Sequence, residues 1–412
     1  MNNPFAELRT LNAQQRRVVA ASFLGWSLDA FDFFLLTFIL KDIAGVFGTD
    51  IKSVAFAILL TLAMRPIGAL IFGRMADRYG RRPTLMADVL LYSALGFASG
   101  FSTSLTMLLV LRSLFGVAMG GEWGVGASLT MESIPPSSRG VVSGLLQAGY
   151  PTGYLLASVA YALLYTHIGW RGMLMLGALP ALLIFFIRRH VPESPVYTAQ
   201  QSKPRVSLAS VLRGNVRLVV YALVMMTAFN FLSHGTQDLY PTFLQVQRQL
   251  SVHEVGIIAI IYNIGAIVGG ITMGMLSEQF GRRRMIALAA FCVLPLIPLW
   301  ALATTPVWIA LGAFLMQVAV QGAWGVVPAH LNELSPPDAR GTFPGFIYQV
   351  GNLIAASNAT IQASVAASHG GNYALALAWT AGLAAAVVAV VTLMGQEKRK
   401  VDFQAIAAQP GS

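Results

Sequence analysis

The segment GRMADRYGRR, Gly73 to Arg82, returns in altered form as GMLSEQFGRR, Gly274 to Arg283. The residues kept 201 positions apart are Gly73, Gly80, Arg81 and Arg82, matched by Gly274, Gly281, Arg282 and Arg283, while the acid Asp77 is matched by the acid Glu278. A second segment keeps the same spacing, because GEWGVGASLTMESIPPSSRG (121–140) aligns with GAWGVVPAHLNELSPPDARG (322–341). Agreement at one spacing in two separate segments predicts a duplicated chain whose halves share one plan and one orientation.

The composition places this duplicated chain in a membrane. Of its 412 residues, 56% are hydrophobic and only 11% are charged, whereas a soluble domain carries roughly 25% charged residues. Its apolar runs reach the roughly 20 residues that a spanning helix needs, and they do not alternate as barrel strands do. We read twelve spans, at 18–40, 54–73, 84–103, 106–128, 141–165, 171–187, 216–240, 255–276, 285–303, 307–329, 342–366 and 373–394. The predicted class is an all-α membrane protein with twelve transmembrane helices.

The repeat and the spans together predict the domain organisation. Residues 1–190 should form an N-terminal six-helix bundle, 191–215 a linker, and 216–412 a C-terminal six-helix bundle, with a pseudo-two-fold axis between the bundles. Parallel repeats of this kind are a transporter architecture in which the substrate site lies between the repeats near the midplane.

The net charge of +10 reflects membrane topology and not a nucleic-acid partner. Most of the 27 Lys and Arg residues fall at the termini, in the linker or in the even-numbered connections between spans. The positive-inside rule therefore places both termini and the linker in the cytoplasm and the chain in a cytoplasmic (inner) membrane. A single cysteine, Cys292, excludes an intrachain disulfide and a thiol metal cluster, and we expect neither a metal nor a cofactor.

Polar residues inside the predicted spans mark candidate sites, because each needs a partner in hydrocarbon. The seventh span ends in NFLSHGTQDLYPT, 230–242, where Asn230, His234 and Gln237 recur at helical spacing on one face. His234 and Asp238 form an i, i+4 pair on that face and could bind and release a proton near neutral pH.

Acids and arginines occur in the first half. Asp29 is the repeat counterpart of Asn230, so we expect the first and seventh helices to face one another across the pseudo-two-fold, with both faces polar. Asp29 and Asp32 need a buried cation, and Arg65 and Arg112 are available inside the spans. Arg65 either holds a substrate carboxylate or forms a salt bridge to one of these acids. Glu122 is either a proton site or a partner of Arg112.

These motifs also carry a family resemblance. The loop after the second span resembles the signature loop of the major facilitator superfamily, Arg112-x-x-x-Gly116-x-x-x-Gly120-Gly121 is similar to its fourth-helix pattern, and VPESP (191–195) is similar to its motif after the sixth helix. The resemblance covers nearly the whole chain and implies alternating access, with charged contacts that latch the ends of the helices in one conformation. The residues to which it assigns this gating role are Asp77, Arg78, Arg81, Arg112, Glu278 and Arg282.

The seventh-helix pattern is more specific. Asn-x-x-Ser-His-x-Thr-Gln-Asp-x-x-x-Thr resembles the motif of fungal lactate–proton symporters in the sialate:proton symporter family. The resemblance implies substrate binding by Arg65, Asn230, His234, Gln237 and Asn352. We expect proton coupling at Asp29, Asp32, Glu122, His234 and Asp238. With twelve spans and without the extra helix pair of the family's sialate carriers, the chain is expected to carry a small monocarboxylate such as lactate or pyruvate.

The sequence thus predicts a proton-coupled importer, driven by the proton gradient and acting as a monomer in the lipid bilayer on a small carboxylate. Symport of sialate or of an aromatic acid is the main alternative. VPESP keeps a sugar symporter open, and a transporter-like nutrient receptor is a further alternative. An enzyme is disfavoured because the sequence has no metal-ligand spacing and no nucleophile elbow.

Overall fold

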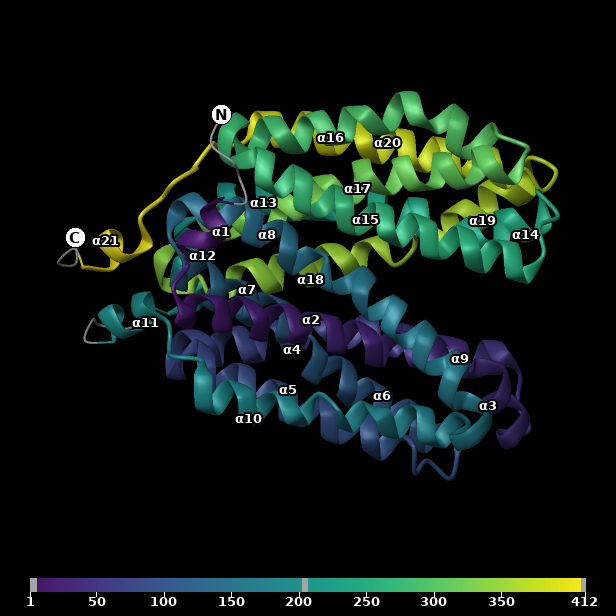
Figure 1. The fold of residues 1–412 in the computed structure, drawn as a ribbon, viewed down its shortest axis with the longest axis horizontal. Coiled ribbons are helices and arrows are strands. Elements are labelled where there is room, and N and C mark those ends of the chain that lie inside the picture. The colour runs from purple at the N-terminus through teal and green to yellow at the C-terminus, as the bar shows by residue number, and fades with distance from the viewer. Residues whose placement is uncertain (1–5, 202–206, 409–412) are drawn as a thin grey trace.

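The computed structural model describes residues 6–201 and 207–408, and these residues form helices joined by short turns, with no strand among them. Figure 1 shows two bundles lying side by side, with their helices running along the long axis of the molecule; one bundle is built mainly from the first half and the other from the second. The helices of the first half are α2 (Ala13–Phe38), α3 (Leu40–Phe47), α4 (Ile51–Tyr79), α5 (Arg81–Ser99), α6 (Leu105–Met119), α7 (Glu122–Ser133), α8 (Arg139–Gln147), α9 (Gly149–Met175) and α10 (Ala181–His190), with the short turns η1 (Pro136–Ser138) and η2 (Leu176–Ala178).

The second half repeats this plan. Its helices are α13 (Val216–Gln237), α14 (Tyr240–Val246), α15 (Val252–Phe280), α16 (Arg282–Ile297), α17 (Pro306–Leu334), α18 (Phe343–Ala355), α19 (Asn358–Ser368) and α20 (Tyr373–Met394), with η3 (Pro298–Leu302) and η4 (Pro337–Ala339). The short helices α1 (Ala6–Thr10), α11 (Pro195–Gln200), α12 (Leu208–Gly214) and α21 (Phe403–Ala408) gather at one end of the molecule, which we call the termini end (Figure 1). The opposite end is called the distal end.

The twelve predicted spans are confirmed, although several are broken or joined. By length and hydropathy, the described residues hold nine segments able to cross a membrane, one of which, Pro136–His190, is 55 residues long. That segment contains the fifth and sixth spans, because the helical geometry breaks at Gly169. The third span is α5, and the eleventh is divided between α18 and α19. The fourth span is likewise divided between α6 and α7.

Two helices cross from one bundle to the other and close the termini end. Helix α8 packs on α15 and α17 of the second half, and its counterpart α18 packs on α4 of the first. Gly124 and Gly345 meet where the bundles touch, since a Cβ added to Gly124 would lie 2.7 Å from the Gly345 Cα. This close approach leaves no passage between the halves at that point.

Two acids at repeat-related positions fasten this contact, which we call the termini-end latch. Asp77, at the end of α4, accepts hydrogen bonds from the backbone N–H groups of Gly341 (2.7 Å) and Thr342 (3.1 Å) and from the Thr342 hydroxyl (2.6 Å). Glu278, at the end of α15, accepts one from the backbone N–H of Gly140 at 2.7 Å. Each acid therefore caps the start of a helix in the other half, where the helix dipole favours a negative charge.

A buried arginine holds each latch acid in place. Arg81 lies 3.4 Å from Asp77 and 3.0 Å from Glu132. In the second half Arg282 lies 2.5 Å from Glu278 and 3.0 Å from Glu333. The two networks use repeat-related residues 201 positions apart: Asp77 and Glu278, Arg81 and Arg282, and Glu132 and Glu333. The repeated sequence thus builds the same charged network twice.

The glutamate of VPESP is a helix cap. Gly80 has φ of 111°, a value that favours glycine, and the turn it makes exposes the first N–H groups of α5. Glu193 accepts from the backbone N–H groups of Arg81 (3.0 Å) and Arg82 (3.2 Å). Burial raises the pKa of Glu193 above its usual value, while these hydrogen bonds oppose the rise. Glu397 caps α16 in the same way, through the N–H of Arg282 at 3.1 Å.

A segment near the C-terminus spans both halves at the termini end. The Phe403 ring lies between two guanidinium groups, those of Arg139 at 3.6 Å and Arg340 at 3.9 Å from its centre. Arg139 also donates to the Val401 carbonyl at 2.5 Å. Since Arg139 and Arg340 are repeat counterparts from opposite halves, Phe403 bridges the pseudo-two-fold axis.

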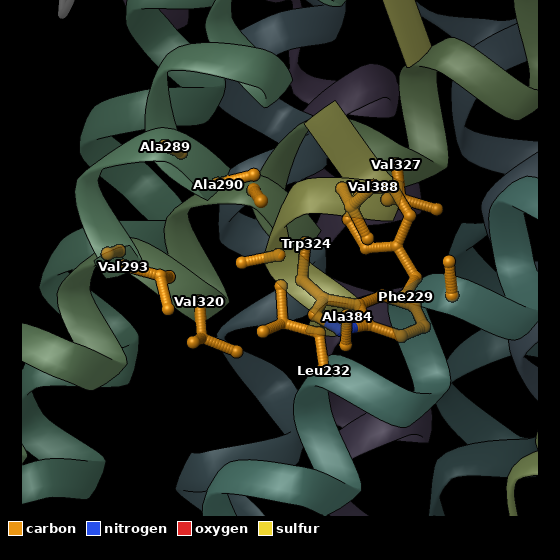
Figure 2. Packing of buried hydrophobic residues seen from close by; sticks show 14 of the residues in the cluster. Phe229, Leu232, Ala289, Ala290, Val293, Val320, Trp324, Val327, Ala384 and Val388 are labelled. Carbon is orange, nitrogen blue, oxygen red and sulfur yellow. The ribbon is translucent and has the colours of Figure 1, made fainter. Parts of the chain in front are cut away.

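The second half has its hydrophobic core on one side of α13. Figure 2 shows Phe229 and Leu232 of α13 near Trp324 and Val327 of α17 and Ala384 and Val388 of α20. The rings of Phe229 and Trp324 meet edge to face, 5.4 Å apart. Because these apolar residues take one face of α13, its polar residues lie on the other.

Glycines let α6 approach the helix that carries Arg65. A Cβ added to Gly116 or Gly120 would overlap the backbone of Thr61 or Arg65 in α4. This is the small-residue packing expected of the fourth-helix pattern. The glycines therefore set the position of Arg65 through its own backbone.

We expect Gly120→Ala to lower the thermal stability of the purified protein, because an added methyl group meets backbone that cannot move unless α4 and α6 separate. Overpacking of this kind typically costs about 1–3 kcal/mol. The matched control is Gly45→Ala in α3, where an added Cβ has no neighbour within 4 Å. A melting temperature reduced equally by both substitutions, or by neither, would contradict the tight α4–α6 contact.

Candidate substrate and proton site

A cavity of about 600 Å³ lies between the two halves. Its lining extends from Trp26, Gln147 and Trp324 in the middle of the bundles to Thr37 near the end of α2 and Ala55 near the start of α4. Both of these helix ends are at the distal end of the molecule. The cavity is therefore reached from the distal end, and the packed helices and the latch close it on the other side.

The polar face of α13 forms one wall of this cavity. Asn230, Ser233, His234 and Gln237 all line it. The Gln237 amide donates to Gln317 Oε1 on α17 at 3.0 Å, so α17 steadies the end of the polar face. Helical spacing in the sequence and the apolar core behind α13 together direct these groups into the cavity.

Both ring nitrogens of His234 lie within hydrogen-bond distance of another side chain. Its Nδ1 lies 3.1 Å from both carboxylate oxygens of Asp238, and its Nε2 lies 2.7 Å from Oδ1 of Asn352 on α18. The side chains of Asp238 and His234 are 32% and 24% exposed, and both line the cavity.

Arg65 lies deeper, at 3% exposure, and lines the same cavity. Its Nη2 is 3.4 Å from Asp29 Oδ2, and its guanidinium is 5.6 Å from the centre of the Phe33 ring. The sequence left open whether Arg65 forms a salt bridge or faces a substrate, and the structure shows both a salt bridge and access to the cavity. The separation of 3.4 Å is long for a charge-assisted hydrogen bond, which leaves the guanidinium able to take another partner.

The other intramembrane charges lie behind the cavity wall and do not line it. Asp32, Arg112 and Glu122 are at most 3% exposed. The carboxylates of Asp32 and Glu122 have no hydrogen-bond partner among the described residues. The Arg112 guanidinium lies over the Phe115 ring at 3.9 Å. Within the spans of this half, four buried acids, Asp32 and Glu122 together with Asp29 and Asp88, share two buried arginines, Arg65 and Arg112.

One expectation about the first helix is wrong. Asp29 and Asp32 do not face α13 across the pseudo-two-fold, because α2 turns Trp26, Phe33 and Phe34 toward the cavity. Asp29 points instead to Arg65 within its own half. A buried carboxylate gains more from a guanidinium than from neutral amides across a wide cavity, and the arginine therefore decides the orientation.

The structure separates the predicted gating residues into two groups. Asp77, Arg81, Glu278 and Arg282 lie together in the termini-end latch. Arg78 is exposed beside the Tyr79 ring, 5.4 Å from its centre, and Arg112 lies in the middle of α6 away from the latch. The motifs alone therefore did not show which of these charged residues join the two halves. Arg78 faces solvent, and Arg112 lies inside the first half.

Sequence reasoning did not identify the aromatic lining of the cavity. Tyr150 and Tyr154 of α9, Tyr262 of α15 and Tyr348 of α18 line it with the rings of α2. The spacing of Tyr150 and Tyr154, one turn apart in an otherwise apolar span, was the available signal. A tyrosine hydroxyl within an apolar span needs a hydrogen-bond partner, which a polar cavity can supply.

Comparison with known proteins identifies the family. Residues 22–248 and 231–410 match the Major Facilitator Superfamily, so the chain belongs to this superfamily of transporters and is not an enzyme. It is 31% identical over 362 residues to a probable 4-methylmuconolactone transporter of Cupriavidus pinatubonensis, with 86% of this chain and 84% of that protein covered. It is 28% identical to the sialic acid transporter NanX of Escherichia coli, with 83% and 85% covered.

The fold has close structural counterparts. The solved proton:xylose symporter XylE superposes with a TM-score of 0.77 at 17% identity, covering 95% of this chain and 99% of that one. At this identity the likeness shows the fold alone.

We expect Arg65→Gln to destabilise the purified protein by about 3 kcal/mol, because it leaves the buried Asp29 carboxylate without its cation. The double variant Arg65→Gln/Asp29→Asn should recover most of this loss, since two neutral amides replace the pair. Melting temperatures of the four proteins in the cycle measure the effect. Strictly additive changes would show that the two side chains do not interact.

Proposed function

We propose that this superfamily member is a proton-coupled importer of a small organic anion in the cytoplasmic membrane. One observation carries the proposal: a single cavity, closed at the termini end, holds a guanidinium at its base and a His–Asp pair at its open side. The first group suits a carboxylate and the second suits a proton. The names of its relatives, which include carriers of organic acids, support the same substrate class.

The orientation follows from the basic residues. We place the termini end in the cytoplasm, because Arg82, Arg283 and most other cations lie there. The cavity then faces outward, and the molecule is in an outward-open conformation. Import requires the latch to part and the two bundles to close over the distal end.

Competition for Arg65 provides the binding step. A substrate carboxylate entering the cavity competes with Asp29 for the guanidinium, and a bidentate contact would favour the substrate. Two ionised carboxylates around one guanidinium leave a net negative charge in a low-dielectric site, which is costly. A proton on Asp29 removes that charge, so anion binding and proton binding reinforce one another.

The His234–Asp238 pair provides the entry point for protons. It is partly exposed to the open cavity, whereas Asp29 is fully buried. Asn352 and Gln237 flank the pair and can donate amide hydrogen bonds to the substrate. A substrate bound between Arg65 and His234 would contact both halves at once, which lets its binding favour closure of the cavity.

The test is uptake into liposomes under an inward proton gradient, with labelled lactate, pyruvate, benzoate, sialate and glucose as separate arms. We expect acid uptake that an uncoupler abolishes. The seventh-helix motif favours lactate or pyruvate, the main alternative is sialate or an aromatic acid, and the separate arms distinguish these substrates. Uptake of glucose alone would favour a sugar symporter, and binding without uptake would favour a receptor.

Asp238→Asn should separate coupling from binding. We expect it to abolish accumulation driven by the gradient, while exchange of labelled for unlabelled acid across the membrane continues. Arg65→Gln should abolish both, because it removes the anion site. The control is Arg284→Ala, an exposed arginine at the start of α16, which should leave both near normal. Unchanged accumulation in Asp238→Asn would exclude this residue as the coupling carboxylate.

A further inference from the structure

The two walls of the cavity differ in chemistry. Besides Arg65, the first half contributes the rings of Trp26, Phe33, Phe34, Tyr150 and Tyr154, together with Ile58, Leu59 and Leu62 of α4. The second half contributes mainly amides and hydroxyls, namely Asn230, Ser233, Gln237, Asn263, Gln321 and Asn352, with Tyr262, Trp324 and Tyr348 among them. A carboxylate bound at Arg65 therefore has aromatic rings beside it and hydrogen-bonding groups opposite.

The rings of the first half form a continuous surface. Trp26 and Tyr150 stack with centres 5.5 Å apart, Phe34 meets Tyr150 edge to face at 5.2 Å, and Phe34 meets Tyr154 in the same way at 4.9 Å. These contacts join α2 to α9 and leave parts of the same rings facing the cavity. At its inner side Phe33 lies next to the Arg65 guanidinium.

We propose that the anion carried has a planar unsaturated ring, which lies against the Trp26–Phe34–Tyr150 surface while its carboxylate meets Arg65. This inference rests on the proposed function and narrows its substrate class. A ring of this kind gains aromatic contacts in addition to burial of its apolar area. Lactate has no planar ring that could pack against the Trp26–Phe34–Tyr150 surface, so this surface would stay in contact with water.

The same series of rings includes residues that line the cavity and residues that do not, so their roles can be compared. Beyond Tyr154 it continues through Phe38 to Tyr161, whose rings stack at 5.2 Å, and then to Tyr165 at 4.7 Å. Phe38 and Tyr161 pack α2 against α9 in the same way, but neither they nor Tyr165 line the cavity. A role limited to helix packing would make Tyr150 and Tyr161 equivalent, whereas a role in substrate binding concerns Tyr150 alone.

The volume of the cavity is large enough for a ligand that contains a ring. Cavities of about 300–1,000 Å³ enclose ligands considerably larger than lactate, and this one measures about 600 Å³ in its open conformation. Volume alone does not choose between ligands, because an open cavity shrinks when the halves close. The chemistry of the surface beside Arg65 makes the choice.

The experiment compares benzoate with cyclohexanecarboxylate, two acids of similar size and charge of which only the first is planar. Binding to the detergent-purified protein is measured by calorimetry, with lactate as a third ligand. We expect benzoate to bind about three- to tenfold more tightly than cyclohexanecarboxylate, within the range that aromatic contacts provide. Tyr150→Leu should remove this preference, and Tyr150→Phe, which keeps the ring, should retain it.

The control Tyr161→Leu should also retain the preference. Phe34→Leu provides a second test at the same surface if Tyr150→Leu does not fold. Equal affinities for the two acids in the unmodified protein, or a preference that survives both leucine substitutions, would overturn the inference. Tighter binding of lactate than of benzoate would overturn it as well, while the proposed function would stand. If no acid binds in a manner that Arg65→Gln abolishes, the proposed function itself fails.

Discussion

A guanidinium inside a bilayer needs a negative partner, and the contact between Arg65 and Asp29 meets this need at the base of the cavity. Much of the first half is arranged around it. Gly116 and Gly120 bring α6 against the backbone of α4 and so fix Arg65 from behind, while Phe33 covers one side of its guanidinium. Because Asp29 turns inward to reach the arginine, α2 is left to present aromatic rings to the cavity. The polar and apolar walls of the site thus follow from one buried charge pair.

The repeat is symmetric where the halves meet and asymmetric where the ligand would bind. At the termini end, Asp77 and Glu278 cap helices of the opposite half with the same supporting arginines and glutamates. In the middle of the molecule the first half keeps acids and arginines, whereas the second half has neutral amides and the His234–Asp238 pair. The latch uses the same contacts on both sides of the pseudo-two-fold axis, so each half contributes equally to closing the termini end. The cavity is asymmetric, which suits a ligand that carries its charge at one end.

Much of this arrangement could be predicted from the sequence, and the part that could not has a clear cause. Apolar runs and the repeat of Gly73–Arg82 predicted the spans and the fold, because a chain that crosses the bilayer must satisfy its backbone hydrogen bonds internally and therefore forms helices. Helical spacing also placed Asn230, His234 and Gln237 on one face. It did not say which way α2 turns, since Asp29 could satisfy its charge either across the cavity or within its own half. The roles of Phe403 and Tyr150 depend on contacts between distant segments, for which local spacing carries no signal.

The ring of Phe403 sits between arginines that belong to opposite halves. Any cycle that parts those halves at the termini end must withdraw this ring, and the segment that carries it then has to find its seat again. In the proposed transport cycle, a stronger contact between this ring and the two arginines would lengthen the time spent in the outward-facing state. Substitutions at these positions, which do not line the cavity, would then change the rate of transport and leave substrate selectivity unchanged.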